Sequence, residues 1–437
     1  MKICIIGIGY VGLVTATCFA DLGNSVWCVD NDQDKVDLLN RGQIPIYEPG
    51  LDELVNKNYF AKRLKFTMNL NLAVKSSDII FICVGTPSLK KSRSPDLQFV
   101  FEVAAEISKY IKKFKIIVNK STVPVTTGDK IEQLISKKIK KELFEVVSNP
   151  EFLREGDAIR DFRFPDRIVL GTNNKKVLKK MVSLYDPLIK KGAKLFTTNR
   201  RGAELIKYSS NAFLATKVSF INELANLCEN SDIDVEDVAL GMGLDQRIGA
   251  RFLRVGPAYG GSCFPKDTKA ITVMGDQFRT NLSIVKSVIK SNEKRKKLLT
   301  KKIEKILSNK VKNKKIAFLG VTFKANTDDM RESSSLTMIP TLSKKGAIIN
   351  YYEPTGEKNE FSRLNNVTFC DNISTACLKV DLIIIHTEWN EFKAIDFKKI
   401  SKNKKLKIYD MRNLYSPHKM NKQGLSYYSI GRKHYST

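Results

Sequence analysis

The chain has 437 residues, a length that predicts two or three domains because a single hydrophobic core stops growing at roughly 250–300 residues. Its formal net charge of +28 would suit a nucleic acid, an anionic membrane surface or an acidic small substrate. The lysines are spread along the chain, and no basic stripe interleaved with aromatic residues occurs. We therefore expect no nucleic-acid partner, and an anionic substrate remains compatible.

The cysteines and histidines indicate the compartment and argue against a metal. Several of the eight cysteines, including Cys4, Cys28 and Cys83, lie in apolar strand-like runs where pairing is implausible. We therefore expect reduced thiols and a cytoplasmic protein. No CxxC pair occurs and the three histidines lie late in the chain, so we expect no metal site. Residues 3–20 carry no charge, but three glycines interrupt them, and we expect no contact with a membrane.

The amino terminus predicts a dinucleotide-binding unit. The apolar run at residues 2–6 suits a buried parallel strand and leads into Gly-Ile-Gly-Tyr-Val-Gly at residues 7–12. In this pattern Gly7 permits a tight turn and Gly9 lets a pyrophosphate approach the backbone. Gly12 allows the following helix to pack closely against the strand.

The next strands favour NAD as the ligand. The apolar run at residues 26–29 ends at Asp30, and an acid there can bind a ribose diol while repelling a 2′-phosphate, which favours NAD over NADP. Thr86 and Thr122 follow two further strand-like runs. Ligands bind beyond the carboxyl ends of parallel strands, so both threonines are candidates to touch the cofactor. Ordinary capping of the two loops is the alternative.

A single thiol marks the candidate active site. Two consecutive glycines precede Cys263, and Lys266 and Asp267 follow it. Glycine lets the backbone approach a ligand closely, and a nearby lysine favours thiolate over thiol. We interpret Cys263 as a nucleophile, with a buried structural cysteine as the alternative. We also expect Pro265 to exclude an ordinary helix through this segment.

One long helix is expected at the centre of the chain. Residues 203–233 contain no Gly or Pro and place apolar residues at helical spacing. Such a helix would span roughly 45 Å, enough to bridge two domains and meet a partner subunit. Lys207 and Asn211 share one of its faces, and both can donate hydrogen bonds to a developing oxyanion. A solvent-facing pair is the alternative.

The carboxyl-terminal part predicts a second α/β unit. We interpret the lysine-dense residues 294–315 as an exposed helix and linker. Strands are expected at residues 315–320, 347–352 and 382–386. The loop at residues 321–333 places the cations Lys324 and Arg331 near the acids Asp328 and Asp329 and suits a phosphate-bearing ligand, with a salt-bridged turn as the alternative. The predicted fold class is α/β, with two Rossmann-like, doubly wound parallel-sheet domains joined by a long central helix.

Five motifs, in order along essentially the whole chain, resemble the UDP-glucose/GDP-mannose dehydrogenase family. They are the glycine fingerprint at residues 7–12, Ser-Thr-Val-Pro at 121–124, Asn-Pro-Glu-Phe-Leu-Arg-Glu-Gly at 149–156, Gly-Gly-Ser-Cys-Phe-Pro-Lys-Asp at 260–267 and the loop at 323–333. The run Pro-Asp-Arg-Ile-Val at residues 165–169 is more similar to the UDP-glucose branch. We expect an NAD-binding domain over residues 1–200, a central helical domain over 201–300 and a UDP-sugar-binding domain over 301–437.

The resemblance implies a four-electron oxidation of UDP-glucose to UDP-glucuronate, using two NAD in succession. A first hydride transfer gives an aldehyde, the thiol adds to it, a second hydride leaves and the thioester is hydrolysed. The lysine and asparagine of the long helix would stabilise the oxyanions. Two carboxylates, helped by a threonine, would hold and deprotonate water, and which acid serves which step stays open. The candidate catalytic residues are Cys263, Lys207, Asn211, Asp267, Glu151 and Thr122.

The resemblance also implies the ligand contacts. The candidates for contact with NAD are Gly7, Gly9, Val11, Gly12, Asp30, Lys35, Thr86, Thr122, Glu155, Lys266 and Arg331. The candidates for holding the UDP-sugar are Glu151, Phe152, Leu153, Arg154, Glu155, Lys207, Asn211, Phe252, Leu253, Arg254, Val255, Gly256, Gly260 and Lys324. Arg247 resembles an arginine that reaches the substrate of the neighbouring subunit, which together with the long helix predicts a homodimer.

Two positions depart from the family pattern. Thr126 stands where the family commonly has glycine, and Glu353 replaces a usual aspartate. Neither is a candidate catalytic group, so we expect activity to survive. The nearest rival function is the same chemistry on GDP-mannose or UDP-N-acetylmannosamine. A non-catalytic, NAD-binding redox sensor and a basic nucleic-acid binder are rivals of other classes.

Overall fold

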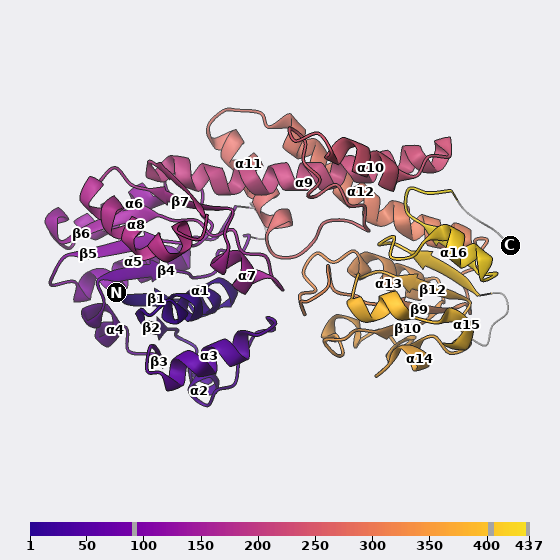
Figure 1. The fold of residues 1–437 in the computed structure, drawn as a ribbon, viewed down its shortest axis with the longest axis horizontal. Helices are drawn as coiled ribbons and strands as arrows, with labels where there is room; N and C mark the ends of the chain where they lie inside the picture. The colour runs from indigo at the N-terminus through magenta and orange to yellow at the C-terminus, as the bar shows by residue number, and fades with distance from the viewer. Residues whose placement is uncertain (90–93, 401–405, 434–437) are drawn as a thin grey trace. The chain divides into compact units, whose positions relative to one another are not determined.

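The computed structural model describes residues 1–89, 94–400 and 406–433 (Figure 1). Contacts divide the chain into two compact units. The first unit comprises Met1–Ser210 and Val273–Thr280, and the second unit comprises Asn211–Thr272 and Asn281–Thr437. The division into three domains expected from the sequence stays a prediction. No helix among the described residues is long and apolar enough to span a membrane.

The first unit alternates strands with helices. Its strands are β1 Lys2–Ile6, β2 Ser25–Val29, β3 Leu64–Thr67, β4 Ile79–Ile82, β5 Lys115–Asn119, β6 Phe144–Ser148, β7 Arg167–Gly171 and β8 Lys194–Thr198. Its helices are α1 Tyr10–Asp21, α2 Gln33–Asn40, α3 Leu51–Phe60, α4 Leu70–Ser76, α5 Gln98–Tyr110, α6 Thr127–Ser136, α7 Ala158–Arg163 and α8 Lys175–Ile189.

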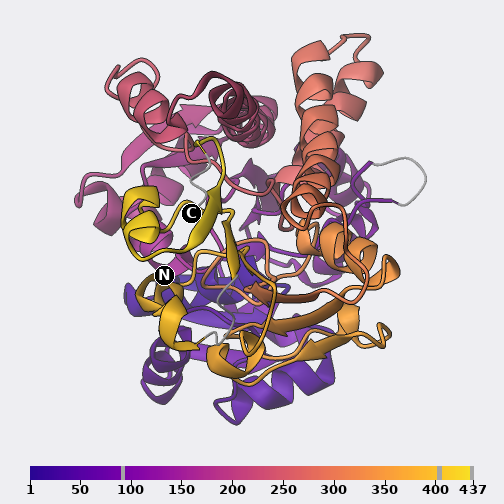
Figure 2. The same cartoon turned by 90° about the vertical axis from the view of Figure 1, so that its right-hand side faces the viewer.

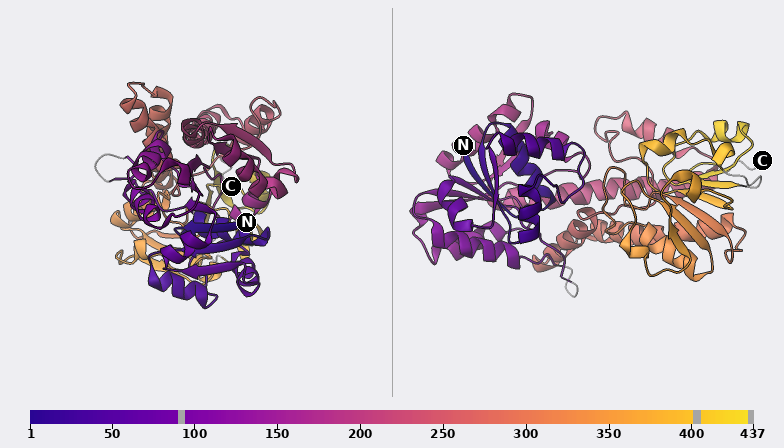
Figure 3. Two further views of the ribbon diagram at one scale, coloured as in Figure 1. Left: turned by 90° about the vertical axis from the view of Figure 1, so that its left-hand side faces the viewer. Right: turned by 90° about the horizontal axis from the view of Figure 1, so that it is seen from below.

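These strands form one sheet in the order β3-β2-β1-β4-β5-β6-β7-β8. Strands β3 to β6 run parallel, whereas β7 pairs antiparallel with β6 and is followed by β8 parallel to β7. The strand order reverses between β1 and β4, which is where doubly wound sheets bind ligands. The twist of the strands and the helices beside them can be followed in Figure 3 (right).

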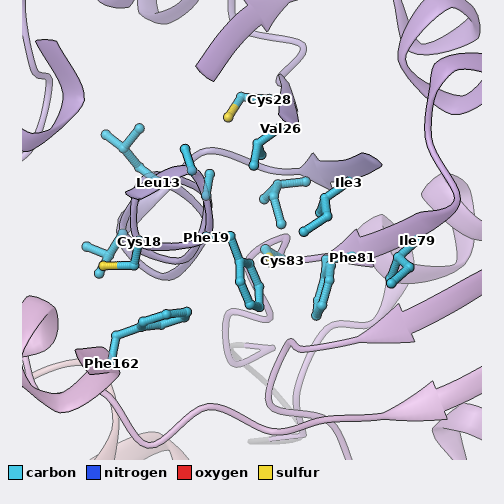
Figure 4. Close-up of a cluster of buried hydrophobic side chains, with 14 of the residues drawn as sticks. Ile3, Leu13, Cys18, Phe19, Val26, Cys28, Ile79, Phe81, Cys83 and Phe162 are labelled. Atoms are coloured by element: carbon cyan, nitrogen blue, oxygen red, sulfur yellow. The ribbon is translucent and has the colours of Figure 1, made fainter. Parts of the chain in front are cut away.

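Alternate residues of each strand face opposite sides of this sheet. Ile3 and Phe81 belong to the core that α1, α3, α7 and α8 cover, whereas Cys4 and Ile80 belong to the core under α4, α5 and α6. Figure 4 shows the first of these cores, where the ring of Phe19 lies 5.3 Å from that of Phe81 and 5.1 Å from that of Phe162. Burial on both faces explains why the strands read as continuous apolar runs.

The second unit begins with the helices that follow the first sheet. Its helices are α10 Val235–Gly243, α12 Ser283–Ile306, α13 Ser335–Lys344, α14 Ile373–Ala376, α15 Phe397–Ile400 and α16 Pro417–Lys422, together with parts of α9 Arg200–Ser231 and α11 Phe264–Gln277. Its strands are β9 Lys315–Leu319, β10 Ile348–Tyr352, β11 Val367–Phe369, β12 Leu382–Ile385, β13 Lys407–Asp410 and β14 Ser426–Ser429.

The six strands of the second unit form a fully parallel sheet in the order β11-β10-β9-β12-β13-β14. Some of these strands, coloured orange and yellow, can be seen in Figure 2. Here the order reverses between β9 and β12, so the loop after β9 lies at a ligand-binding position. One face packs on α9, α10, α12 and α13, and the other packs on α15, α16 and the segments around Cys377, Trp389 and Phe392. The predicted fold class, with two doubly wound sheets and a long helix, is confirmed.

Two sequence-based expectations about helices are wrong. Helix α11 begins at Phe264, directly after Cys263, with Pro265 in its first turn. The proline is tolerated there because the first four N–H groups of a helix have no intrahelical acceptor. Helix α12 is not simply an exposed lysine-rich helix, since Asn292, Arg295 and Lys296 are buried on one of its faces.

An acidic residue after the second strand closes the first loop in both sheets. In the first unit the Ile8 N–H donates to Asp30 at 2.8 Å. In the second unit the Val321 N–H donates to Glu353 at 2.7 Å. Glu353 is buried and also accepts from the N–H of Thr322, and burial raises its pKa. Glutamate thus serves as a backbone acceptor at this position, consistent with a role in folding the loop.

A buried histidine lies beside the same loop. His386 follows β12, and its ring nitrogens lie 2.8 Å from the Ser334 hydroxyl and 3.1 Å from the Thr387 hydroxyl. Burial, together with the positive charge of Arg412, lowers the pKa of His386 to about 3. The folded protein therefore holds this ring neutral at pH values where an unfolded chain would protonate it.

We predict that this histidine makes the protein less stable in acid. Its pKa falls from 6.5 to about 3 on folding, so its contribution is present above pH 6.5 and is lost by about 1.4 kcal/mol per pH unit below it. Urea unfolding at several pH values should show the stability difference between wild type and His386→Gln shrinking below pH 6.5. The exposed His418→Gln variant should keep a constant difference. Parallel curves for His386→Gln would contradict this account.

Candidate functional site

The glycine loop after β1 has the geometry of a dinucleotide cradle. A Cβ on Gly12 would lie 1.8 Å from the Gly7 carbonyl oxygen, and Gly7 itself has a φ of 88°. A Cβ on Gly9 would meet nothing within 4 Å. Gly9 caps α1 without a side-chain hydrogen bond, and the first turn of α1 holds no acidic residue. The amino end of α1 therefore suits an anionic pyrophosphate.

The acid at the end of β2 is placed to meet a ribose. Besides the Ile8 N–H, Asp30 contacts the ammonium of Lys35 at 3.4 Å. One carboxylate oxygen is thus engaged by the glycine loop and by Lys35, and the other accepts from the Asp32 N–H at 3.2 Å. This arrangement orients the carboxylate beside the cradle.

The loops after β4 and β5 meet at the same sheet edge. The Thr86 hydroxyl donates to the Thr122 carbonyl oxygen at 3.0 Å. Thr86 thus has a structural role in the loop, as the capping alternative expected. Thr122 is half-buried at this edge.

Thr126, which stands where the resembled family commonly has glycine, has a strained backbone conformation. Thr126 caps α6 with a φ of 80°, in the left-handed region. Its N–H donates to the Glu204 carboxylate at 2.9 Å, and the Gly128 N–H donates to the same carboxylate at 2.8 Å. The backbone must therefore take this shape to bind Glu204, and a β-branched residue takes it at a cost.

We predict that Thr126→Gly stabilises the protein by about 1 kcal/mol, because it removes Cβ strain that exceeds the entropy cost of glycine. The neighbouring Thr127→Gly is the contrast. Thr127 is helical, and its hydroxyl donates to the Pro124 carbonyl at 2.6 Å, so its loss should destabilise. Unfolding free energies of both variants test this, and a destabilised Thr126→Gly would contradict the strain argument.

A buried ion pair follows β6 in the first unit. Glu151 and Lys207 are 6% and 3% exposed, and the Lys207 ammonium lies 2.9 Å from the Glu151 carboxylate. The Leu153 N–H donates to the other carboxylate oxygen at 2.6 Å. Burial alone would raise the pKa of Glu151, but Lys207, this N–H and Lys120 outweigh it and lower the pKa. Glu151 is therefore an ionised carboxylate with a cation fixed beside it.

Sequence reasoning missed a second buried cation near this pair. Lys120 is buried, and its ammonium donates to the Asn149 side chain at 3.3 Å. Burial lowers the pKa of Lys120, while the nearby Cys83 and Glu151 counteract that effect. Its position within the Lys-Ser-Thr-Val-Pro run was visible, but nothing in the sequence indicated that its side chain points inward.

The other candidates after β6 have separate contacts. The Phe152 ring lies beneath the guanidinium of Arg167, 3.9 Å from its centroid, and beneath Lys207 at 5.3 Å. Arg154 is exposed and binds both carboxylate oxygens of Asp161. Glu155, which directly follows Arg154, is half-buried.

Glu48 is a second residue that sequence reasoning missed. Its buried carboxylate accepts from the N–H groups of Gly156 at 2.6 Å and Ala158 at 2.7 Å, and also from the Tyr10 hydroxyl. It therefore ties the Glu155–Gly156 turn to the start of α1. The Tyr-Glu-Pro-Gly run at residues 47–50 was the available signal.

In the second unit, Cys263 precedes the first residue of α11. Its carbonyl oxygen accepts from the Asp267 N–H at 2.8 Å, and its sulfur lies 3.5 Å from the Ser262 hydroxyl. None of the eight cysteines forms a disulfide, and Cys263 is half-buried whereas the other seven are buried. A thiol at the amino end of a helix lies where an anionic thiolate is favoured.

The two glycines before this thiol pack against the protein. Gly261 has a φ of 76°, and a Cβ there would lie 2.6 Å from the Phe323 ring. A Cβ on Gly260 would lie 2.8 Å from the Glu332 carbonyl oxygen. Within the described part of the second unit, the missing side chains therefore admit the loop after β9.

A buried polar cluster surrounds Asp267. The Asn211 amide donates to one carboxylate oxygen at 2.6 Å, and the Lys266 ammonium donates to the other at 2.7 Å. Asp267 is 1% exposed. Lys266 therefore shares its charge with Asp267 rather than acting on the thiol alone.

The predicted sugar loop divides into buried and exposed members. Leu253, Val255 and Gly256 are buried, whereas Arg254 is exposed and Phe252 has a φ of 66°. Arg247, earlier in the same connection, has a side chain that is 89% exposed and is bound to Asp245.

The loop after β9 presents its cations differently. Arg331 forms an ion pair with Asp329 at 2.8 Å, as the salt-bridged alternative expected, and its carbonyl oxygen accepts from the Gly261 N–H at 2.8 Å. The ammonium of Lys324 lies 5.6 Å from the centroid of the Phe323 ring.

The structure thus groups many of the predicted residues within each unit. In the first unit it joins Asp30 to Lys35 and Glu151 to Lys207. In the second it joins Asn211, Asp267 and Lys266, the last two of which follow Cys263 in α11. Arg154 and Arg247 instead bind neighbouring acids on the surface.

One sizeable pocket contains none of the predicted site residues. Its volume is about 940 Å³, and it is lined by Asp129, Glu132, Gln133, Ser136, Lys137, Asn173, Asn199, Arg200 and Arg201. Its arginines already bind acids, with Arg200 and Arg201 lying 2.8 Å and 2.6 Å from Asp129. We assign this pocket no role.

Comparison with known proteins decides the family. Residues 1–189 match the NAD binding domain of the UDP-glucose/GDP-mannose dehydrogenase family, residues 201–294 its central domain and residues 317–417 its UDP binding domain. The chain belongs to this family. As a UDP-glucose/GDP-mannose dehydrogenase it is an NAD-dependent oxidoreductase, which confirms the predicted family, enzyme class and cofactor.

Relatives of this dehydrogenase match over most or all of their length. It is 45% identical over 435 residues to the UDP-glucose 6-dehydrogenase of Rhizobium meliloti, covering 99% of this chain and 100% of that protein. It is 43% identical over 434 residues to UDP-glucose 6-dehydrogenase TuaD of Bacillus subtilis, covering 99% and 93%. The solved structure of a UDP-glucose dehydrogenase from Pyrobaculum islandicum matches with a TM-score of 0.90 at 32% identity, covering 99% of this chain and 97% of that one.

We predict that iodoacetamide alkylates Cys263 before any other cysteine of the folded enzyme, because the other seven thiols are buried. Peptide mass spectrometry at partial labelling should find the modification on Cys263, and Cys263→Ala should lose the fast phase. Fast labelling of any buried cysteine in native protein would contradict the geometry.

Proposed function

We propose that this dehydrogenase oxidises UDP-glucose to UDP-glucuronate through a covalent adduct on Cys263. The observation that carries the proposal is the half-buried thiol of Cys263, directly before α11. Lys266 and Asp267 follow it in the first turn of that helix and form a polar cluster with Asn211. The names of the relatives, which are UDP-glucose 6-dehydrogenases at up to 45% identity over the whole chain, support the choice of sugar nucleotide.

The cofactor would be held in the first unit. The cradle of Gly7, Gly9 and Gly12 would receive the pyrophosphate, with Val11 beside it, and Asp30 with Lys35 would meet the ribose. Thr86, Thr122 and Glu155 would add further contacts in this unit, and Lys266 and Arg331 stay candidates on the sequence resemblance. When bound, NAD supplies the hydride acceptor for both oxidations.

The thiol allows the aldehyde from the first oxidation to be oxidised a second time. The thiolate sulfur of Cys263 bonds to the aldehyde carbon, and the carbonyl oxygen becomes an oxyanion that accepts hydrogen bonds. Loss of hydride from that carbon leaves a thioester. Water then adds to the thioester carbon, the carbon–sulfur bond breaks, and sulfur departs as the thiolate together with the carboxylate product.

The polar groups divide these tasks. Lys207 and Asn211 supply hydrogen-bond donors for the successive oxyanions. Glu151 and Asp267 are the acceptors for a water proton, and Thr122 helps to position that water. The lowered pKa of Glu151 keeps it ionised, as a base requires. The assignment of the two acids to individual steps stays open.

The nucleotide part of the substrate would bind mainly to the second unit. The matched UDP binding domain begins at residue 317 and includes the loop that carries Lys324. Gly260 and residues 252–256 of the same unit are candidates to hold the sugar, and residues 151–155 are the candidates from the first unit. GDP-mannose and UDP-N-acetylmannosamine are the rival substrates.

The surface of the second unit supports a homodimer. On α9, Phe213, Phe220 and Leu227 recur every seven residues and are 65%, 48% and 60% exposed. Leu240 on α10 and Leu244 directly after it are also exposed. Large apolar side chains aligned on one helix face are typical of an interface. The exposed Arg247 is available to reach the substrate of a partner subunit. Because none of the eight cysteines forms a disulfide, we also propose a reducing, cytoplasmic location.

The proposed reaction fixes the stoichiometry of reduction. Purified protein offered UDP-glucose, UDP-N-acetylmannosamine and GDP-mannose separately should form two NADH per UDP-glucose consumed and little with the other two. Absorbance at 340 nm and nucleotide chromatography measure the ratio. One NADH per sugar would contradict the double oxidation, and preference for another nucleotide sugar would replace the substrate.

We predict that Phe220→Glu converts the dimer to a monomer, because it places a charge within the apolar face of α9. Sedimentation velocity at micromolar concentration measures the change, with Lys294→Glu, an exposed position on α12, as the control. A wild-type monomer, or an unaltered Phe220→Glu dimer, would remove this face from the interface.

A further inference from the structure

Helix α12 carries a row of buried polar side chains within an apolar stripe. Val288, Leu299 and Ile303 of the stripe are apolar. Between them, Asn292, Arg295 and Lys296 are only 4%, 5% and 4% exposed. Burying amide and cationic groups costs free energy unless they are hydrogen-bonded. The contacts of these three residues, which we call the α12 polar row, therefore indicate their purpose.

Asn292 holds the residue that precedes the two glycines. Its side-chain oxygen accepts from the Tyr259 N–H and its side-chain nitrogen donates to the Tyr259 carbonyl, both at 3.0 Å. One amide thus satisfies both backbone groups of Tyr259, as a neighbouring strand would. Tyr259 is buried, and Gly260 and Gly261 that follow it have wide backbone freedom. Asn292 therefore fixes the backbone at Tyr259, directly before the two glycines that lead to Cys263.

Arg295 holds the last residue of the predicted sugar loop. Its Nε donates to the Gly256 carbonyl at 2.8 Å and its Nη1 donates to the Asn222 carbonyl at 2.9 Å. The Gly256 N–H donates to the Asn222 side chain at 3.0 Å, so both backbone groups of Gly256 are also bound. Side chains from α9 and α12 together clamp this peptide.

The choice of an arginine at this place is costly. The Arg295 hydrogen bonds that the structure describes go to carbonyl oxygens, and its Nη2 has no hydrogen-bond partner among the described residues. Burial lowers its pKa to about 10, so it remains a cation at neutral pH. Apolar residues of similar volume often replace buried charges without loss of stability. A role beyond stability accounts better for this guanidinium.

Lys296 holds the loop after β9. Its ammonium lies 2.9 Å from one carboxylate oxygen of Glu332, and Lys269 of α11 lies 3.1 Å from the other. Glu332 has a φ of 55°, a strained value for a residue with a Cβ. The adjacent Arg331 accepts from the Gly261 N–H at 2.8 Å. Gly261, the second of the two glycines, is thus hydrogen-bonded to the residue beside Glu332, which Lys296 binds.

We propose that the α12 polar row positions groups for the proposed reaction. It fixes the backbone of the sugar loop and of residues 259–261 before Cys263, and thereby sets the position of the thiol relative to the bound sugar. The proposal rests on the proposed function of Cys263. Misplacement of a reacting group by about 1 Å can cost on the order of 100-fold in rate. The three residues act through the backbone and touch no reacting atom.

The first test is kinetic. Arg295→Met should raise KM for UDP-glucose at least tenfold while leaving KM for NAD within twofold, because it releases Gly256. Arg295→Lys, which keeps a cation and can bind one carbonyl, should restore part of that loss. Asn292→Leu should lower kcat at least tenfold. Each variant is assayed well below its own melting temperature, so that a purely structural role would leave these constants unchanged.

The controls are exposed lysines on the same helix. Lys297→Met matches Arg295→Met, and Lys294→Leu matches Asn292→Leu. Both controls should keep wild-type kinetic constants. If Arg295→Met or Asn292→Leu does not fold, Arg295→Lys carries the test, since its KM for UDP-glucose should exceed that of wild type. Wild-type kinetic constants in Arg295→Lys and in every folded row variant would overturn the proposal.

A second readout needs no turnover. Iodoacetamide should alkylate Cys263 at least threefold faster in Asn292→Leu than in wild type, because release of Tyr259 opens the half-buried thiol. If wild type lacks dehydrogenase activity yet this acceleration appears, the proposed function has failed and the positioning of the segment stands. If wild type is active and the alkylation rate is unchanged, the positioning role has failed.

Discussion

A carboxylate removed from water must be given hydrogen-bond donors of its own, and this constraint organises both units. Glu151 receives the Lys207 ammonium and a backbone N–H, and Asp267 receives an amide and an ammonium. Glu48 and Glu353 receive backbone N–H groups instead. Acids bound to the backbone fold loops, whereas the two that bind a side-chain cation or amide are the ones proposed to handle protons.

The same constraint distinguishes the two related sheets. Asp30 stands 9% exposed at the end of β2, beside a glycine cradle that has open space at Gly9. Glu353 at the equivalent place in the second sheet is buried against its loop. The same kind of sheet therefore offers a dinucleotide site in the first unit. In the second unit it places the loop with Lys324 and Arg331 where the strand order reverses, between β9 and β12.

The two sheets and the long helix could be predicted because they depend on residues that are close together in the sequence. Apolar runs ending in glycine or aspartate gave both sheets, because a parallel strand is buried on both faces. The long helix followed from an unbroken periodic segment. Pro265 misled because a proline rule for helix interiors was applied to what proved to be a first turn.

Long-range contacts could not be read in this way. The sequence shows lysine at 296 beside exposed lysines, and only packing reveals that its ammonium meets Glu332. Lys120 and Glu48 were hidden for the same reason, since their partners lie far along the chain or on another element. Thr126 was flagged as a departure, but its φ of 80° had to be seen.

The central claim is that Cys263 carries the second half of the oxidation. The most direct test is UDP-glucuronate formation by Cys263→Ala, with NAD binding measured by fluorescence titration in the same preparation. The account predicts that NAD binds as in wild type while net formation of the acid is abolished. Acid formation at the wild-type rate in this variant would contradict the covalent mechanism.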